Sequence, residues 1–284
     1  MSTIKRPILS GDEFLDDVWG ASDRSEPFHV WWLGQSGFLL QWKGRHFLFD
    51  PYLSDSLTKK YADTDKPHVR MTERVIEPER LDFVDVVTST HNHTDHLDAD
   101  TLVPLLRVNR DVALVIPEAN RAFVAARLDV DASLPLGLDD GGSVEVHDFI
   151  VHGVPAAHED LERDDEGRLT HLGYVVEFGP WTVYHAGDTI RYEGMAERLR
   201  AWTIDVAILP INGRAPERRV AGNLSGEEAA QLAHDIDAQV VIPCHYDMFE
   251  FNTASPEPFR AAAQRLGQRA VILENGGRWS WFKR

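Results

Sequence analysis

The chain of 284 residues is long enough to bury a large hydrophobic core, and its 43% hydrophobic and 26% charged residues are ordinary for a globular protein. A formal net charge of -17 argues against a nucleic-acid backbone or an anionic membrane surface as a partner, because both attract basic proteins. No stretch approaches the roughly 18 uncharged apolar residues that predict a membrane-spanning helix. The N-terminus lacks an apolar signal-peptide core, and the single Cys244 admits no internal disulfide, so we expect a cytoplasmic protein.

The first 80 residues predict strands followed by a loop. Residues 1–26 are polar and are interpreted as an N-terminal extension. Short apolar and aromatic segments at 28–33, 38–42 and 46–49 are separated by glycine-containing turns and predict an antiparallel strand series. Residues 54–80 are polar and charged, and predict a loop.

From residue 83 onward, apolar runs alternate with segments of helical spacing. Strands are predicted at 83–88, 112–116, 143–154 (as a pair), 172–178, 181–185, 206–209, 239–242 and 270–273. Helices are predicted at 99–107, 119–127, 193–202, 225–236 (opened by a Ser-Gly-Glu-Glu capping box) and 258–266, with a solvated loop at 159–169. This order suggests two sheets with helices on their outer faces, and the absence of a linker favours a single domain over residues 1–284.

The strongest chemical signal is residues 89–98, Ser-Thr-His-Asn-His-Thr-Asp-His-Leu-Asp. The imidazoles of His91, His93 and His96 and the carboxylate of Asp95 fall within six residues, between a predicted strand and a predicted helix. A turn at the end of a strand can aim consecutive side chains at one point. Because imidazole and carboxylate are common ligands of zinc and other transition metals, the cluster predicts a metal site rather than a polar surface turn.

One turn cannot enclose a metal, so further ligands are expected at the ends of other strands. His158, Asp188 and His245 each follow a predicted strand. Alone, each would be interpreted as a helix cap or a solvated turn, but together with the cluster they complete a ligand set. Cys244 precedes His245 at the end of an apolar run and is interpreted as a buried structural thiol rather than a nucleophile.

In this order, these motifs resemble the metallo-β-lactamase superfamily over residues 28–284. Further segments resemble the L-ascorbate-6-phosphate lactonase (UlaG-like) family, namely 34–37 (Gly-Gln-Ser-Gly), 185–189 (His-Ala-Gly-Asp-Thr), 210–213 (Pro-Ile-Asn-Gly) and 243–249 (Pro-Cys-His-Tyr-Asp-Met-Phe). The resemblance implies an αββα sandwich of the metallo-β-lactamase type, with two divalent metal ions, zinc or manganese, at one edge between the sheets.

The resemblance also implies a role for each ligand. It assigns His91, His93 and His158 to one metal, Asp95, His96 and His245 to a second, and Asp188 to a bridging position. Such a metal pair lowers the pKa of a water and polarises the scissile carbonyl or phosphoryl oxygen. Asp95 is the predicted catalytic residue, because it can also orient the attacking oxygen or accept its proton.

Other polar residues have weaker signals. Asn212 and Arg214 begin a segment that could bind an anionic substrate group, and Tyr246 could donate to a developing oxyanion. His185 could orient Asp188 without binding the metal itself. The loops at 54–80, 159–170 and 212–224 are expected to set specificity. The remaining histidines are given ordinary structural interpretations, in or near strands or in polar surroundings: His29, His46, His147, His152, His171, His68 and His234.

The resemblance favours a metal-dependent lactonase that opens a sugar-derived lactone, with or without a phosphate group. Two alternatives stay open: a phosphodiesterase, of the N-acylphosphatidylethanolamine phospholipase D type or a nuclease, and a metal-binding regulator without turnover. The charge weighs against a nuclease, and the complete ligand set weighs against a regulator. We expect a small-molecule substrate, no nucleic-acid or membrane partner, and leave self-association into a homo-oligomer open.

Overall fold

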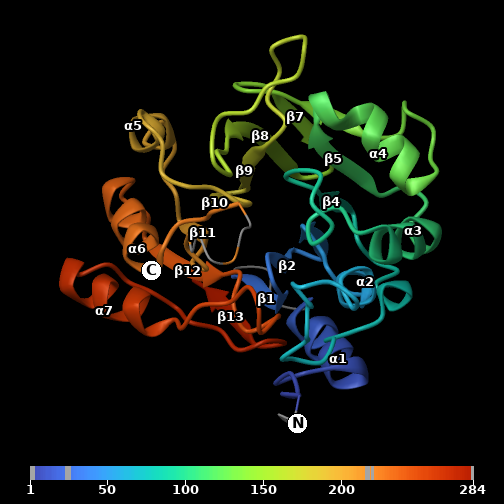
Figure 1. Ribbon diagram of the computed structural model, residues 1–284, viewed down its shortest axis with the longest axis horizontal. Helices are drawn as coiled ribbons and strands as arrows, with labels where there is room; N and C mark the ends of the chain where they lie inside the picture. The colour runs from blue at the N-terminus through green and yellow to red at the C-terminus, as the bar shows by residue number, and fades with distance from the viewer. Residues whose placement is uncertain (1–3, 23–26, 215–217, 219–220, 283–284) are drawn as a thin grey trace.

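The computed structural model describes residues 4–22, 27–214, 218 and 221–282. Two sheets lie face to face with helices outside them (Figure 1). The first sheet has the order β13 (Arg278–Trp281), β1 (Phe28–Gly34), β2 (Gly37–Trp42), β3 (Arg45–Phe49), β4 (Val86–Thr88), β5 (Ala113–Pro117) and β6 (Leu136–Leu138). The second has the order β12 (Val240–Cys244), β11 (Val206–Pro210), β10 (Trp181–His185), β9 (Leu172–Phe178), β8 (Phe149–Pro155) and β7 (Ser143–Val146).

The helices complete a four-layer arrangement, which confirms the predicted sandwich. They are α1 (Gly11–Ser22), α2 (Ser56–Lys60), α3 (Ala99–Val108), α4 (Arg121–Leu128), α5 (Met195–Leu199), α6 (Gly226–Asp235) and α7 (Glu257–Leu266), with short 3-10 turns at Pro78–Arg80 and Glu118–Asn120. The predicted capping box is present at the start of α6, where Ser225 and Glu228 bond reciprocally. No helix among the described residues is long and apolar enough to span a bilayer.

The central strands are buried on both faces. Along β1, Phe28, Val30 and Trp32 contribute to the core between the sheets, whereas Trp31 and Leu33 pack in a second core that includes residues of α1, α3 and α4. This alternation follows from the two-residue period of a strand. Burial of both faces explains why most residues of these strands are apolar instead of alternating with polar ones.

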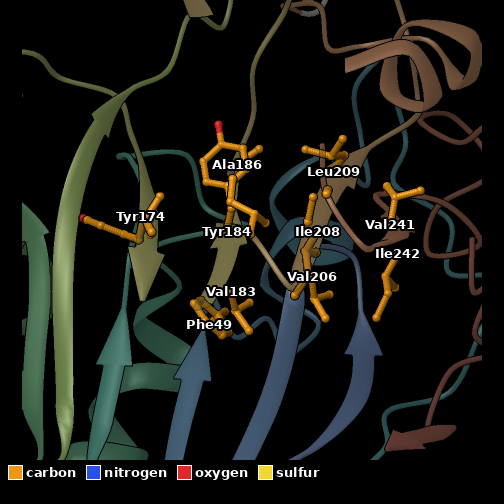
Figure 2. Close-up of a cluster of buried hydrophobic side chains, with 14 of the residues drawn as sticks. Phe49, Tyr174, Val183, Tyr184, Ala186, Val206, Ile208, Leu209, Val241 and Ile242 are labelled. Atoms are coloured by element: carbon orange, nitrogen blue, oxygen red, sulfur yellow. The ribbon is translucent and has the colours of Figure 1, made fainter. Parts of the chain in front are cut away.

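Figure 2 shows part of the core between the sheets, to which Phe49 contributes from the first sheet and Val183 and Ile208 from the second. The core is continuous across β10, β11 and β12, so the ends of these strands are held rigidly. A rigid strand end fixes the direction of the side chains that follow it. The candidate site depends on this property.

The strand directions bring several carboxyl ends to one edge. Strand β1 is antiparallel to β2, β2 is antiparallel to β3, and β3 is parallel to β4, so β1, β3 and β4 run the same way. By the same reasoning β8, β10, β11 and β12 share one direction in the second sheet. The segments that leave these seven strands therefore emerge together at an edge of the sandwich.

The interpretation of residues 1–26 as a polar extension is wrong for the described part. Residues 11–22 form α1, which buries Phe14, Val18 and Ala21 against the outer face of the first sheet. Asp17 accepts a hydrogen bond of 2.8 Å from the indole of Trp31. These apolar positions are spaced for one helix face, but acidic residues separate them, so the sequence pattern alone does not predict the helix.

The predicted strand at 270–273 is also wrong. Only an isolated bridge joins Ala270 to Val241 of β12, through hydrogen bonds that involve Arg269 and Val271. The segment then departs from β12, and the carbonyl of Leu273 accepts a hydrogen bond from a side chain instead of continuing the ladder. Strands β6 and β13 were not predicted, and the helix predicted at 193–202 is confined to α5.

Replacing His46 should change how stability responds to acid. Burial lowers the pKa of His46 from its usual 6.5 to about 4, although Asp85 opposes the shift. The folded protein therefore binds fewer protons than the unfolded chain between these pH values, and stability falls as the pH drops through that window. From the shift, His46 should account for about 3 kcal/mol of that loss. Urea unfolding should be measured for wild type and His46→Gln at pH 7 and pH 4. Between these pH values the free energy of unfolding should fall by about 3 kcal/mol less in the variant than in wild type. Equal losses would contradict the assignment.

Candidate metal centre

The turn between β4 and α3 aims several imidazoles at one point. The hydroxyl of Ser89 donates to the carbonyl of His91 at 2.9 Å, and the N–H of Leu97 donates to the carbonyl of His93 at 2.8 Å, which fix the turn. The Nε2 atom of His91 lies 3.0 Å from Nδ1 of His93. His96 lies at the bottom of the turn and is fully buried.

Three side chains from distant strand ends meet this turn. His158 follows β8, Asp188 follows β10 and His245 follows β12. Asp188 is central: its Oδ1 lies 3.3 Å from Nε2 of His96, and its Oδ2 lies 3.3 Å from Nε2 of His245 and 3.5 Å from Nε2 of His158. The structure thus brings together all seven side chains that were predicted as ligands.

A glycine makes the close approach of Asp188 possible. Gly187 has a φ of 61°, and a Cβ at that position would lie 2.7 Å from the side chain of Thr90. A larger residue would therefore push the Asp188 turn away from the His91–His96 turn. The glycine in the Gly-Asp sequence after β10 therefore allows the two turns to pack closely.

The donor atoms fall into three overlapping groups, each with all its atoms within 4.8 Å of one another. The groups are His91–His93–His158, His91–His96–Asp188 and Asp95–His96–His245. Nε2 of His96 and Oδ1 of Asp188 are buried without a hydrogen-bond partner, which is costly unless another group satisfies them. Nitrogen and oxygen donors of this kind fit the divalent metals that the resemblance implies.

Hydrogen bonds at Nδ1 orient the rings of two of the histidines. Nδ1 of His158 donates to the carbonyl of Gly222 at 2.9 Å, and Nδ1 of His96 lies 2.7 Å from Oδ2 of Asp50. In both rings Nε2 is left to face the centre, as in metal sites where an outer partner fixes the tautomer.

The charges at the centre are strongly coupled. Burial alone would lower the pKa of His96, but the carboxylates of Asp188 and Asp95 raise it well above its usual value. Burial likewise opposes the carboxylates at His245, whose pKa is raised to about 9. Burial lowers the pKa of His91 well below its usual value, and neighbouring imidazoles add to that effect. The carboxylates of the centre are therefore balanced by positive charge on His96 and His245. Bound metal ions could supply that positive charge instead.

Asp50 was not predicted to belong to the site. It is fully buried at the end of β3, accepts hydrogen bonds from the hydroxyls of Thr88 and Thr90, and contacts His96. It has a φ of 35°, uncommon for a residue other than glycine. The signal that could have found it is its place after a predicted strand, the same rule that selected His158, Asp188 and His245.

His171 was interpreted as an ordinary strand histidine, but it belongs to the surroundings of the centre. Its ring stacks on that of His91 with 4.8 Å between centroids and lies edge-on to His93 at 6.1 Å. Burial lowers its pKa to about 4, so it stays neutral. Its position directly before β9 carried no signal that separated it from other strand histidines.

A pocket of about 360 Å³ opens onto the centre. Of the seven candidate ligands, His91 and His96 lie beneath it, and the other five line it. Three cationic side chains, Lys60, Lys66 and Arg127, also line it. Within the described chain the expected specificity loops 54–80 and 212–224 contribute to the lining, whereas 159–170 does not.

The secondary candidates have different outcomes. Asn212, predicted to bind substrate, lines the pocket. Arg214 does not line it and forms an ion pair with Glu228 at the start of α6. His185 lies between the sheets, where Nε2 donates to the carbonyl of Ser36 at 2.9 Å and the ring stacks on Phe49, so it does not support Asp188 by a hydrogen bond.

Tyr246 also lies outside the pocket lining. It is buried, and its hydroxyl donates to the carbonyl of Leu273 at 2.6 Å, which leaves it unable to donate to a substrate oxygen. Tyr246 therefore does not make the oxyanion contact that the sequence suggested. The apolar surroundings that bury Tyr246 also bury Cys244, and burial raises the pKa of that thiol well above its usual value, which suits a structural role.

Tyr246→Phe should accordingly reduce stability and leave catalysis unchanged. Loss of the hydroxyl leaves a buried carbonyl without its donor, which should lower the free energy of unfolding by about 1–2 kcal/mol. The kcat and KM of the variant should match those of wild type. A fall in kcat of about 100-fold or more, typical of a lost oxyanion donor, would show that Tyr246 does donate to the substrate oxygen.

Comparison with known proteins agrees with this geometry. Residues 29–245 match the family described as the β-lactamase superfamily domain, so the chain belongs to the metallo-β-lactamase superfamily. The UPF0173 metal-dependent hydrolase of Hyperthermus butylicus is 28% identical over 87% of this chain and 97% of its own. That of Archaeoglobus fulgidus is 30% identical over 89% and 99%.

A solved structure shares the fold. The metallo hydrolase Igni18 of Ignicoccus hospitalis superposes with a TM-score of 0.67 at 21% identity, over 91% of this chain and 100% of its own. The fold and the relatives support a metal-dependent hydrolase of this superfamily.

Proposed function

We propose that the protein is a lactonase that uses two divalent metal ions, zinc or manganese, to open a sugar-derived lactone, with or without a phosphate group. The observation that carries the proposal is the position of Asp188 between imidazoles from three other strand ends, within 3.5 Å of one nitrogen of each. A carboxylate in this place can bridge two cations. The absence of a thiolate among the seven donors suits either metal.

The metals, when bound, would lower the pKa of a water and polarise the ester carbonyl. His91, His93 and His158 would hold one of them, and Asp95, His96 and His245 the other. Asp95 lines the pocket, so its carboxylate can also orient the attacking oxygen and accept its proton. Opening of the ring ester produces a hydroxyl and a carboxylate, and the cations at the pocket suit that anionic product.

The pocket lining supports a substrate with both an anionic group and an apolar ring face. Lys60, Lys66 and Arg127 offer positive charge in a protein of net charge -17. In the same lining Tyr61 stacks on His68 at 4.5 Å between centroids, and His68 meets Phe249 edge-on at 5.1 Å. These rings can pack against the C–H face of a sugar-derived lactone.

The same cations favour a second candidate, a phosphodiesterase, because a phosphodiester is also anionic. The two reactions are separated by assaying metal-loaded protein against phosphorylated and unphosphorylated sugar lactones and against bis-p-nitrophenyl phosphate. We expect ring opening of at least one lactone with kcat/KM above about 10⁴ M⁻¹s⁻¹, the lower end of the usual enzymatic range. Hydrolysis of the diester alone would favour the phosphodiesterase, and no turnover with both metals bound would favour a regulator.

A further inference from the structure

The turn between β1 and β2 holds Gln35 in an uncommon backbone conformation. Its φ is 50°, in the left-handed region that residues other than glycine rarely adopt. Its carbonyl accepts two hydrogen bonds, from the indole of Trp32 at 3.0 Å and from the N–H of His245 at 2.9 Å. Such a conformation persists where its surroundings fix it, and it is concentrated at functional sites.

The side chain that this backbone presents is directed at the candidate metal centre. Gln35 is 1% exposed and lines the pocket. Its Nε2 lies 2.8 Å from Oδ2 of Asp95 and 3.1 Å from Nε2 of His245. The nitrogen, not the oxygen, must face Asp95, because an amide oxygen and a carboxylate oxygen would repel each other.

This contact matters because Asp95 has few other partners. Across the described residues, the other ion-pair partners of its carboxylate are imidazoles, with Nε2 of His245 at 3.4 Å and Nε2 of His96 at 3.8 Å from Oδ2. Those nitrogens are predicted to bind metal and would then no longer donate to Asp95. The amide of Gln35 would remain as a neutral donor that holds the carboxylate without changing the charge of the site.

We propose that Gln35 is a positioning residue: its amide donates to Asp95 and holds that carboxylate in the orientation that binds the metal shared with His96 and His245. The inference rests on the proposed metal site. It assigns a function to the Gly-Gln-Ser-Gly turn, which the sequence singled out and the ligand set does not use. Because Gln35 acts through Asp95, its effect must vanish when the Asp95 carboxylate is absent.

A double-mutant cycle on metal binding tests this dependence. Gln35→Met keeps the length of the side chain and removes the donor, and the same substitution is made in an Asp95→Asn background. The dissociation constants of both Zn²⁺ equivalents are measured by competition with a chromophoric chelator. Loss of an outer partner typically weakens metal affinity about 10- to 100-fold, so we expect at least about tenfold weakening of one equivalent in the wild-type background and less than about twofold in the Asp95→Asn background.

The matched control is Gln41→Met in β2. Gln41 is also 1% exposed, but its amide donates to the carbonyl of Val18 and contacts His46, and it does not line the pocket. This variant should lower the Tm and leave both dissociation constants unchanged. If Gln35→Met does not fold, Gln35→Asn, whose amide is too short to reach Asp95, takes its place in the same cycle.

The outcomes separate the inference from the proposed function. An unchanged Zn²⁺ affinity in Gln35→Met, or an equal loss in both backgrounds, would overturn the positioning role while leaving the metal site intact. Wild-type protein that binds no Zn²⁺ would overturn the proposed metal site, on which the inference depends.

Discussion

Asp188→Asn should lose at least one bound metal ion. The carboxylate lies near one imidazole nitrogen of the His91–His93–His158 group and near two of the Asp95–His96–His245 group, so it is placed to contact both cations. A bridging carboxylate offsets the repulsion between two dications, and an amide cannot. Because the loss of an outer partner alone weakens metal affinity up to about 100-fold, the loss of a direct ligand should weaken one equivalent by about 100-fold or more.

The measurement is the metal content of the purified variant after loading with excess zinc and gel filtration. Asp100→Asn is the matched control, because Asp100 is an exposed carboxylate in the first turn of α3 whose ion pair with Lys59 spans 3.9 Å. The control should keep the wild-type content. Two retained equivalents in Asp188→Asn would show that this carboxylate does not bridge.

Asp95→Asn should have the opposite profile, with more metal retained and most turnover lost. Asp95 approaches the imidazoles of His96 and His245 and lines the pocket, so it faces one donor group and the substrate space. An amide cannot accept a proton from the attacking water. General acid–base catalysis contributes about 10²–10⁴-fold, so kcat should fall by that factor.

Single-turnover rates and metal contents of the two aspartate variants should be compared under the same loading conditions. The roles are reversed if Asp188→Asn keeps two metals while Asp95→Asn keeps none. A kcat within about tenfold of wild type in metal-loaded Asp95→Asn would remove Asp95 from proton transfer, since the expected loss is larger.

The fold was predictable where the local pattern and the tertiary environment agree. The aromatic and β-branched segments of β1, β2 and β3 predict strands, and burial between a second sheet and helices is consistent with their composition. The pattern failed where context decides. The apolar positions of α1 are separated by acidic residues, and the segment at 270–273 has strand composition but makes only one bridge.

The candidate site was predictable from one rule, that polar residues directly after apolar strands meet at an edge. This rule correctly selected His158, Asp188 and His245 as residues that lie close to the histidine cluster. Asp50 satisfies the same rule, but a carboxylate before a proline is also typical of an ordinary turn, so the sequence alone does not single it out. The contact of His171 with His91 depends on how β9 lies against the turn after β4, and no local pattern encodes that arrangement.

The central claim is that the seven converging side chains form a site for two metals. Its most direct test is elemental analysis of wild-type protein reconstituted separately with excess zinc and with excess manganese, then freed of unbound metal. We expect two equivalents per chain with at least one of the two metals. Less than one equivalent under both conditions would contradict the claim.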